Sequence, residues 1–375
     1  MLRKHGVAAI AAAGIAVVTM LLMPAHGRTT GWQDTFSPSL PDLTGPRPVG
    51  ARRMLLTDES RRDPWVPAEP RRLMVDVHYP AVATSALEHY YRSNAATELG
   101  VLEWAPAQEK RLGLVTDEVN WLFRTHGHEW APVADGRYPV VVLSAGPGRR
   151  RTDWRSLAED LASHGYIVAS VDHPYDSSVV ELFPTRRVVS PSDASNEVPA
   201  DKADETRARD LRYVATHLTD VDPDVARTAD PSRIGFVGRV GLGTGQARAL
   251  SALPGVRAIA SIGAVPADVD AGGTQQAAVL VVAPHPARTG AVSGAWRVVG
   301  VAGSTESGLT DDGIVLAQIA RHRPHSAAAI RAEIGTPPPA DTIRRYVRAF
   351  LDLQLKGVAD GTFESRPPAG VTVGR

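Results

Sequence analysis

The segment Arg233-Ile-Gly-Phe-Val-Gly-Arg-Val-Gly-Leu-Gly-Thr-Gly-Gln-Ala247 decides the fold of this chain. It starts with an apolar run that is typical of a buried strand, continues through closely spaced glycines, and leads into a helix that we expect from about Gly243 to Leu253. Glycine permits the tight backbone turn that a junction of strand and helix requires. The segment therefore predicts one strand–turn–helix unit of an α/β sheet.

The rest of the chain from Tyr138 onward repeats this alternation of strands and helices. Continuous β-branched runs indicate strands that are buried on both faces of a parallel sheet. The strands are predicted at 139–144, 166–171, 233–237, 257–262, 278–283 and 296–301. Helices are predicted at Trp154–His164, at Thr206–Leu218 and, with apolar residues spaced along one face, at Thr342–Leu355. This pattern predicts a doubly wound, mostly parallel sheet, in which Leu73–Tyr79 is the first clear strand.

The N-terminal residues 1–27 have the features of a signal peptide. Arg3 and Lys4 precede an apolar stretch from Val7 to Met23, and Ala25-His26-Gly27 has small residues where a signal peptidase cuts. We expect cleavage and a secreted protein. The alternative is an uncleaved anchor, with the domain outside the cytoplasm, because about 20 apolar residues span a bilayer.

The mature chain is expected to form one α/β domain with short additions. Residues 28–70, rich in proline and polar residues, are predicted to wrap the surface, and residues 71–357 to form the domain. A small helical cap or insertion is expected at about 85–125, and a flexible tail at 358–375. Since the sequence contains no cysteine, stability must come from a large apolar core without disulfides.

The charge balance excludes some classes of partner. The chain has 41 basic and 41 acidic residues, and its arginines occur in short clusters such as Arg149-Arg150-Arg151, which are typical of a solvated face. Nucleic acids and anionic membrane surfaces attract strongly basic proteins. We therefore predict no nucleic-acid partner, and membrane contact only through the N-terminal segment if it is uncleaved.

The glycine-rich turn is built like the nucleophile elbow of an α/β-hydrolase. That elbow has the pattern G-x-S-x-G, and its sharp turn exposes the serine hydroxyl above the sheet. In this chain Gly238-Arg239-Val240-Gly241-Leu242 has valine in the place of the serine, and no G-x-S-x-G occurs elsewhere.

Several further segments, in the same order, resemble the secreted platelet-activating-factor acetylhydrolase family and its actinobacterial lipase-like relatives. They are Leu43–Gly50, Arg61–Trp65, Arg72–Pro80, Asp160–Val168, Asp172–Asp176 and Arg345–Asp352. The resemblance covers roughly residues 40–357. It implies an α/β-hydrolase fold, an ancestral ester-hydrolase activity and a lipid-like or ester-like small-molecule ligand.

The resemblance also implies where the catalytic residues of the family would lie, and none of them is intact. The serine position falls on Val240, or on Gly241 with a shift of one residue; the aspartate position falls on Gly263 and the histidine position on Glu306. The two oxyanion-hole positions fall on Pro147 and Gly241. Proline has no N–H to donate to an oxyanion.

Other residues suggest other chemistries. Glu306 could act as a base with Ser304, Thr305 or Ser307 as nucleophile, but no third group that would orient it is evident, and a solvated loop is the simpler interpretation. His126-Gly-His128 could bind a metal, but it lacks a third ligand at a fixed spacing, so no metal site is predicted.

Two further features have structural interpretations. His173 is expected to be a structural loop residue. The turn Gly241–Gly245 lacks the acidic residue that a dinucleotide site needs about 20 residues further on, so no cofactor is predicted.

The sequence leaves two hypotheses about function. The first is a secreted, catalytically inactive α/β-hydrolase homologue that binds a lipid or a partner. The second is an active ester hydrolase that uses other residues. A hydroxyl, a base and free backbone N–H groups that converge at the mouth of the elbow would favour the second.

Overall fold

The computed structural model describes residues 35–83, 91–93, 98–185, 187–220, 222–240, 245–263, 269–270, 277–285, 292–293 and 297–374. These residues belong to one compact unit, Thr35–Arg375. The predicted signal peptide at 1–27 and Gly241 lie outside the described residues. Within the described ranges, none of the helices is both long and apolar enough to cross a membrane.

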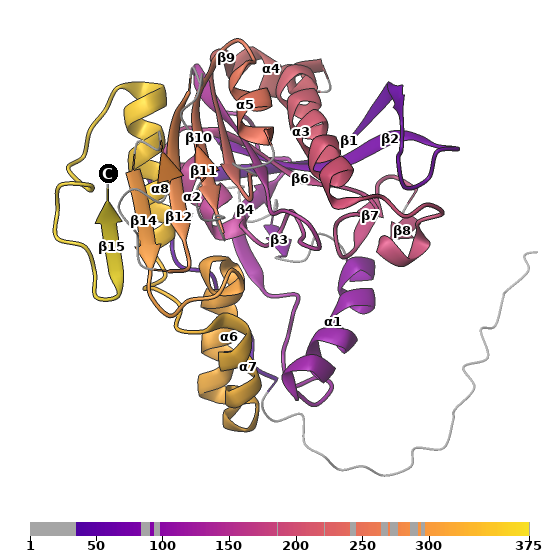
Figure 1. Ribbon diagram of the computed structural model, residues 1–375, viewed down its shortest axis with the longest axis vertical. Coiled ribbons are helices and arrows are strands. Elements are labelled where there is room, and N and C mark those ends of the chain that lie inside the picture. The colour runs from indigo at the N-terminus through magenta and orange to yellow at the C-terminus, as the bar shows by residue number, and fades with distance from the viewer. Residues whose placement is uncertain are drawn as a thin grey trace, which may run out of the picture. The chain divides into compact units, whose positions relative to one another are not determined.

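An eleven-stranded sheet forms the centre of this unit (Figure 1). Its strands are β1 (Val49–Arg62), β2 (Pro70–Pro80), β3 (Tyr91–Ser93), β4 (Arg124–Glu129), β5 (Tyr138–Ser144), β6 (Ile167–Asp172), β9 (Ala229–Gly238), β10 (Val256–Ile262), β12 (Ala278–Ala283), β14 (Arg297–Val301) and β15 (Val371–Gly374). Two small sheets pair β7 (Val180–Leu182) with β8 (Arg187–Val189) and β11 (Val269–Asp270) with β13 (Val292–Ser293).

The helices of the described chain vary from one to five turns. They are α1 (Glu98–Leu112), α2 (Arg155–Ser163), α3 (Ala200–His217), α4 (Pro223–Thr228), α5 (Gln246–Ser251), α6 (Asp311–His322), α7 (Ala327–Ile334) and α8 (Thr342–Leu351). Short 3₁₀ turns are η2 (Pro191–Asp193), η3 (Leu218–Asp220), η4 (Ser307–Leu309) and η5 (Pro324–Ser326), and η6 (Asp352–Lys356) is a π turn that continues α8.

The strand order confirms the predicted fold class. The order is β15-β14-β12-β10-β9-β5-β6-β2-β1-β4-β3, so the six strands predicted from the β-branched runs lie side by side. Pairing is parallel from β14 to β6, and β2 is antiparallel to both β6 and β1. The sheet is therefore doubly wound and mostly parallel.

Apolar side chains fill both faces of the sheet because neighbouring residues of each strand point in opposite directions. In β5, Val140 and Val142 face the cluster that includes apolar residues of α3 and α5, whereas Val141 and Leu143 face the cluster that includes those of α2 and α8. The predicted closing helix is thus confirmed in its first ten residues, which pack against the second of these faces.

A separate apolar cluster joins α1, α6 and α7, which lie together at one end of the unit in Figure 1. Trp121 and Phe123, from the predicted insertion, are buried in this cluster, with exposed fractions of 8% and 3%. Ile319 of α6 and Ile330 of α7 pack in the same cluster. Trp121 and Phe123 therefore serve as packing residues.

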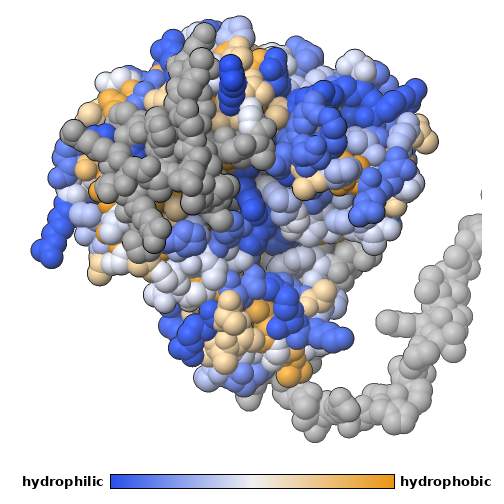
Figure 2. Space-filling model, in the orientation of Figure 1, coloured by the Kyte–Doolittle hydropathy of each residue, from blue (hydrophilic) through white to orange (hydrophobic). Residues whose placement is uncertain are grey.

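The outer surface carries few large apolar side chains. On the face seen in Figure 2, hydrophilic residues predominate and the hydrophobic ones form small groups. The exposed large hydrophobic residues of the described chain are Val82, Val115, Leu122, Trp130, Phe183 and Val358. Such single residues are ordinary on protein surfaces.

Two sequence predictions were wrong. Leu73–Tyr79 is preceded by the long strand β1, so residues 49–62 belong to the sheet and do not wrap the surface. The predicted flexible tail contains β15, whose residues pair antiparallel with β14. Phe363 also contacts Tyr346 of α8, with 5.4 Å between the ring centroids. In both places backbone pairing with a neighbouring strand outweighs a polar local sequence.

Candidate functional site

Four loops follow the C-terminal ends of β5, β9, β10 and β14, and they carry the positions that the sequence indicated: Pro147, Val240, Gly263 and Glu306. In open α/β sheets, ligands bind at this edge of the sheet. These four loops therefore define the candidate site.

Val240 does not stand at an exposed elbow. Its side chain is 2% exposed and belongs to the apolar cluster beneath the sheet, together with Ala247 and Leu250 of α5. Its N–H donates to Gly238 O at 2.9 Å, and its carbonyl accepts a hydrogen bond from Ser261 Oγ at 2.8 Å. A hydroxyl at this position would consequently face the core.

Gly238 makes the turn after β9 possible. Its φ is +110°, and a Cβ atom there would lie 2.0 Å from Ser144 O. Only glycine fits so close an approach at a positive φ. The strand–turn–helix geometry of an elbow is therefore kept, although its nucleophile is not.

An ion pair joins the loops after β9 and β14. Arg239 Nη1 donates to Glu306 Oε2 at 2.8 Å, and the two side chains are 42% and 30% exposed. A Cβ atom on Gly263 would point at this pair, since it would lie 3.5 Å from Glu306 Oε1 and 3.9 Å from Arg239 Cγ. Arg239 also covers Gly146, whose Cβ would lie 2.7 Å from Arg239 Cβ. The structure thus brings Gly263 and Glu306 together and inserts Arg239 between the loops.

The loop after β5 has few backbone donors left for an oxyanion. Pro147 is exposed and lies between Gly146 and Gly148, both of which have positive φ. The Gly148 N–H donates to Asp176 O at 2.8 Å, and the Arg149 N–H donates to Gly146 O at 3.2 Å. Two neighbouring N–H groups are therefore committed within the protein, and Pro147 has none.

The hydroxyls beside Glu306 donate to partners other than Glu306. Ser304 Oγ donates to Thr305 O at 3.0 Å, Thr305 Oγ1 donates to Glu333 O at 2.7 Å, and Ser307 Oγ donates to Glu333 Oε1 at 2.8 Å. Each of these hydroxyl protons is thus used to fix the loop to its neighbours. This arrangement fits a structural role better than that of a nucleophile activated by Glu306.

A chain of serine, histidine and aspartate lies below the same edge of the sheet. Ser144 Oγ is 3.0 Å from His173 Nε2, and His173 Nδ1 is 2.9 Å from Asp210 Oδ2. Ser144 ends β5, His173 follows β6, and Asp210 belongs to α3. The order of contacts is that of a catalytic triad.

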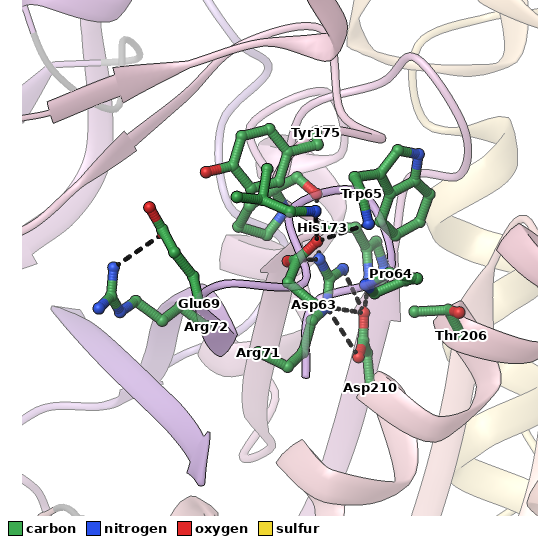
Figure 3. A network of polar contacts seen from close by, with 12 residues as sticks. Asp63, Pro64, Trp65, Glu69, Arg71, Arg72, His173, Tyr175, Thr206 and Asp210 are labelled. Carbon is green, nitrogen blue, oxygen red and sulfur yellow. Dashed lines mark hydrogen bonds and ion pairs between the residues drawn. The ribbon is translucent and has the colours of Figure 1, made fainter. Parts of the chain in front are cut away.

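Figure 3 shows that Arg71 contacts Asp210, the aspartate of the Ser144–His173–Asp210 network. Arg71 donates to Asp210 from Nε and Nη2 and to Asp63 Oδ2 from Nη1, the last at 2.6 Å. Burial alone would raise the pKa of Asp210, but the charge of Arg71 and the hydrogen bond with His173 outweigh it and lower that pKa far below its usual range. Asp210 is therefore a fixed anion.

The Ser144–His173–Asp210 network differs from a working catalytic triad because it is buried. Ser144, His173 and Asp210 are 0%, 1% and 0% exposed. A nucleophile must reach the substrate carbonyl, and this hydroxyl has no contact with solvent. Ser144 and Asp210 had no recognisable signal in the sequence, because their partners lie 29 and 37 residues away from them, on other elements.

His126 and His128 lie on strand β4. His126 Nε2 is 3.0 Å from Pro41 O, so its ring ties the N-terminal segment to the sheet. In the described part of the chain, no three histidine, aspartate or glutamate side chains gather as metal ligands.

The strand order, the glycine turn after β9 and the loops at the C-terminal edge define a protein of the α/β-hydrolase class. The family described as platelet-activating factor acetylhydrolase, isoform II, matches residues 36–215. A ferulic acid esterase from Streptomyces cinnamoneus has a similar solved structure, with a TM-score of 0.69 and 27% identity, covering 90% of this chain and 99% of that one.

Two relatives by sequence carry related names. A probable 1-alkyl-2-acetylglycerophosphocholine esterase of Arthroderma benhamiae is 29% identical over 157 residues, which cover 38% of this chain and 39% of that protein. The platelet-activating factor acetylhydrolase of Canis lupus familiaris is 40% identical over 62 residues, which cover 16% of this chain and 12% of that protein. The matched segments thus span less than half of either relative. The chain therefore has the α/β-hydrolase fold, and residues 36–215, just under half of it, are similar to the platelet-activating factor acetylhydrolase family.

Proposed function

We propose that this protein is a non-hydrolytic α/β-hydrolase homologue that binds a lipid-like or ester-like molecule, or a partner, without turning it over. The observation that carries the proposal is the ion pair between Arg239 and Glu306 at the sheet edge where the family resemblance places catalysis. An arginine in contact with a glutamate offers neither a neutral base nor an exposed nucleophile.

The missing groups correspond to a large loss of rate. In the best-studied protease, removal of the nucleophile or the base lowers kcat by about 10⁶-fold. One missing oxyanion donor lowers it by about 10²–10³-fold. The family resemblance places the nucleophile at Val240, which is buried, and an oxyanion donor at Pro147.

The ligand class is proposed from the relatives and not from a pocket. Their names specify an alkyl-acetylglycerophosphocholine ester and a ferulic acid ester as substrates of those proteins. We propose that this chain binds a molecule of the same broad kind. We also propose export from the cytoplasm, on the basis of the signal-peptide pattern at 1–27.

A second candidate function is ester hydrolysis through Ser144, His173 and Asp210. The hydrogen-bonded order of these three residues favours it. The complete burial of the three residues opposes this function, and so does the ion pair between Arg71 and Asp210. We therefore rank it below the non-hydrolytic function.

The test combines turnover, labelling and binding. The purified protein is assayed with p-nitrophenyl acetate and with a fluorophosphonate probe, and the Streptomyces cinnamoneus esterase serves as the positive control. We expect rates equal to those of heat-denatured protein and no labelling. Saturable hydrolysis with stoichiometric labelling of one serine would refute the proposal, and labelling at Ser144 would establish the second candidate.

The binding half of the proposal is tested by calorimetric titration with monomeric 1-alkyl-2-acetylglycerophosphocholine, with acetate release measured in the same samples. We expect saturable heat and no acetate. Absence of binding to this probe would reject the proposed ligand and leave a partner protein as the occupant to be sought.

A further inference from the structure

Helix α2 begins without a cap of its own. Its N-cap residue, Trp154, makes no side-chain hydrogen bond to the helix, and the first turn has no acidic residue. The first N–H groups of a helix need such acceptors. Here the carboxyl group of Asp311, the first residue of α6, takes this role.

Asp311 binds the start of α2 through three contacts. Its Oδ2 accepts the Ser156 N–H at 2.9 Å, its Oδ1 accepts the Ser156 hydroxyl, and its own N–H donates to Asp153 O at 3.0 Å. Ser156 and Asp311 are 155 residues apart in the sequence. These contacts form a joint between α2 and α6. The joint fixes α6, and the loop with Glu306 that precedes α6, to helix α2.

Several acidic groups surround the joint. Asp311 is 5% exposed, and burial is the main reason that its pKa rises to about 7. The hydrogen bonds from Ser156 oppose this rise, whereas the negative charges of Asp153 and Glu159 on the α2 side add to it.

The next residue, Asp312, faces the other neighbouring elements. Its Oδ2 accepts a hydrogen bond from Arg149 at 3.0 Å, and Arg150 pairs with Asp153 at 2.9 Å. Burial and the charge of Asp153 raise the pKa of Asp312 to about 6; Arg149 and Arg150 oppose this rise, and Glu333 of α7 adds to it. With all carboxyl groups ionised, the joint therefore contains a net excess of negative charge.

A small cavity adjoins the carboxyl group of Asp311. It has a volume of about 20 Å³ and is lined in part by Trp154, Ser156, Asp311 and Arg344 of α8. This volume is enough for one water molecule. The indole N–H of Trp154 has no hydrogen-bond partner among the described residues and could bind such a water. A proton can thus reach the joint without unfolding it.

We propose that Asp311 is a proton-operated cap, which closes the joint between α2 and α6 when its carboxyl group is protonated and loosens it when that group ionises. The protonated acid can donate to Ser156 Oγ while its second oxygen still accepts the Ser156 N–H. Ionisation places an additional negative charge beside Asp153, Glu159 and Asp312. The loop that carries Glu306 gains mobility as a result, whether or not the protein hydrolyses esters.

The sign of the pH effect follows from linkage. Folded Asp311 holds its proton more tightly than the unfolded chain does, so its stabilising effect is complete below the ordinary pKa of 3.8 and is lost as the pH rises through about 7. One titrating group changes the folding equilibrium constant by at most about tenfold per pH unit. We therefore expect a measurable fall in stability between pH 5 and pH 8.

The experiment compares the wild type with Asp311→Asn by urea unfolding and by hydrogen exchange at pH 5, 6, 7 and 8. Asparagine can accept the Ser156 N–H and donate to Ser156 Oγ, but it cannot ionise. We expect the folding equilibrium constant of the wild type to fall by up to about tenfold for each pH unit from pH 5 to pH 7. Exchange at the Ser156 amide should accelerate beyond its intrinsic pH dependence. Asp311→Asn should lack the part of both effects that Asp311 causes, whereas the part caused by Asp312 should remain.

Asp135→Asn is the matched control, because Asp135 is an aspartate with a side chain 91% exposed. It should keep the pH dependence of the wild type. Equal pH dependence in the wild type and Asp311→Asn would overturn the proposal. If Asp311→Asn does not fold, infrared spectra of Asp312→Asn decide, because the pKa of Asp312 is raised as well. A protonated carboxyl band that this variant shows at pH 5 and loses by pH 8 supports the proposal, and no such band at pH 5 overturns it.

Discussion

Replacement of Ser144 by alanine separates the structural role of the buried Ser144–His173–Asp210 chain from a catalytic one. The substitution removes one oxygen atom and the 3.0 Å contact with His173 Nε2. His173 stays hydrogen-bonded to Asp210 through Nδ1, but its Nε2 loses a partner in a site that excludes solvent. A buried polar group left without its partner costs about 1–3 kcal/mol. We expect Ser144→Ala to destabilise the fold by this amount and to lower Tm by a few degrees.

The assay for stability is urea unfolding followed by fluorescence of the seven tryptophans. Ser170→Ala is the matched control, since Ser170 is a buried serine of the neighbouring strand β6 and its Oγ has no hydrogen-bond partner among the described residues. Loss of a hydroxyl that has no partner is expected to be neutral or slightly stabilising. Equal destabilisation by the two substitutions would show that the contact with His173 contributes nothing.

The same variant is assayed for ester hydrolysis and fluorophosphonate labelling. If the Ser144–His173–Asp210 network has only a structural role, Ser144→Ala leaves the background rate of ester hydrolysis unchanged. If the network is catalytic, loss of the nucleophile lowers the rate by several orders of magnitude and abolishes labelling. That second result would refute the structural interpretation.

Three further substitutions test the site and its support. Val240→Ser should not create activity and should destabilise the fold by about 2–4 kcal/mol, because it removes methyl groups from the core and buries a hydroxyl; urea unfolding and the p-nitrophenyl acetate assay check this. Gly238→Ala should reduce the yield of folded protein severely, because its Cβ would lie 2.0 Å from Ser144 O, and circular dichroism of the soluble fraction measures the effect. Asp210→Ala leaves the guanidinium of Arg71 buried with Asp63 as its one remaining carboxylate partner in the described structure, and should cost about 3–5 kcal/mol in the same unfolding assay.

The strands of the parallel sheet could be predicted from the sequence because both of their faces are buried. Each is then a continuous run of apolar residues, and no knowledge of its neighbours is needed. Strand β1 follows a different rule. Its arginines look exposed in the sequence, yet Arg52 is buried and bonds Asp222, and Arg53 lies 3.4 Å from Asp76. An arginine that is buried by pairing with a distant aspartate cannot be told from a surface arginine by local pattern.

The candidate site could be predicted only in part for the same reason. The family resemblance indicated Gly263 and Glu306, and the structure places them side by side. Arg239 was missed although it adjoins Val240, because its partner Glu306 lies 67 residues further along the chain. The His173 network was missed because a lone histidine after a strand carries no information about what it contacts.

We propose that Gly263, Glu306 and Arg239 compensate one another at the positions where the resemblance places the family's catalytic residues. A glutamate in place of the histidine would bring a carboxylate to a position that had faced another carboxylate. The loss of side chain at Gly263 removes that second acid, and Arg239 supplies the opposite charge at 2.8 Å. The pair is partly exposed, so it contributes no more than about 1 kcal/mol; its main effect is to keep Glu306 paired and to cover Gly146. Restoring a histidine at 306 alone would place it next to the Arg239 guanidinium, and a neighbouring positive charge lowers the pKa of an imidazole and weakens it as a base. The proposed lack of hydrolysis therefore rests on Arg239 as well as on the valine at position 240.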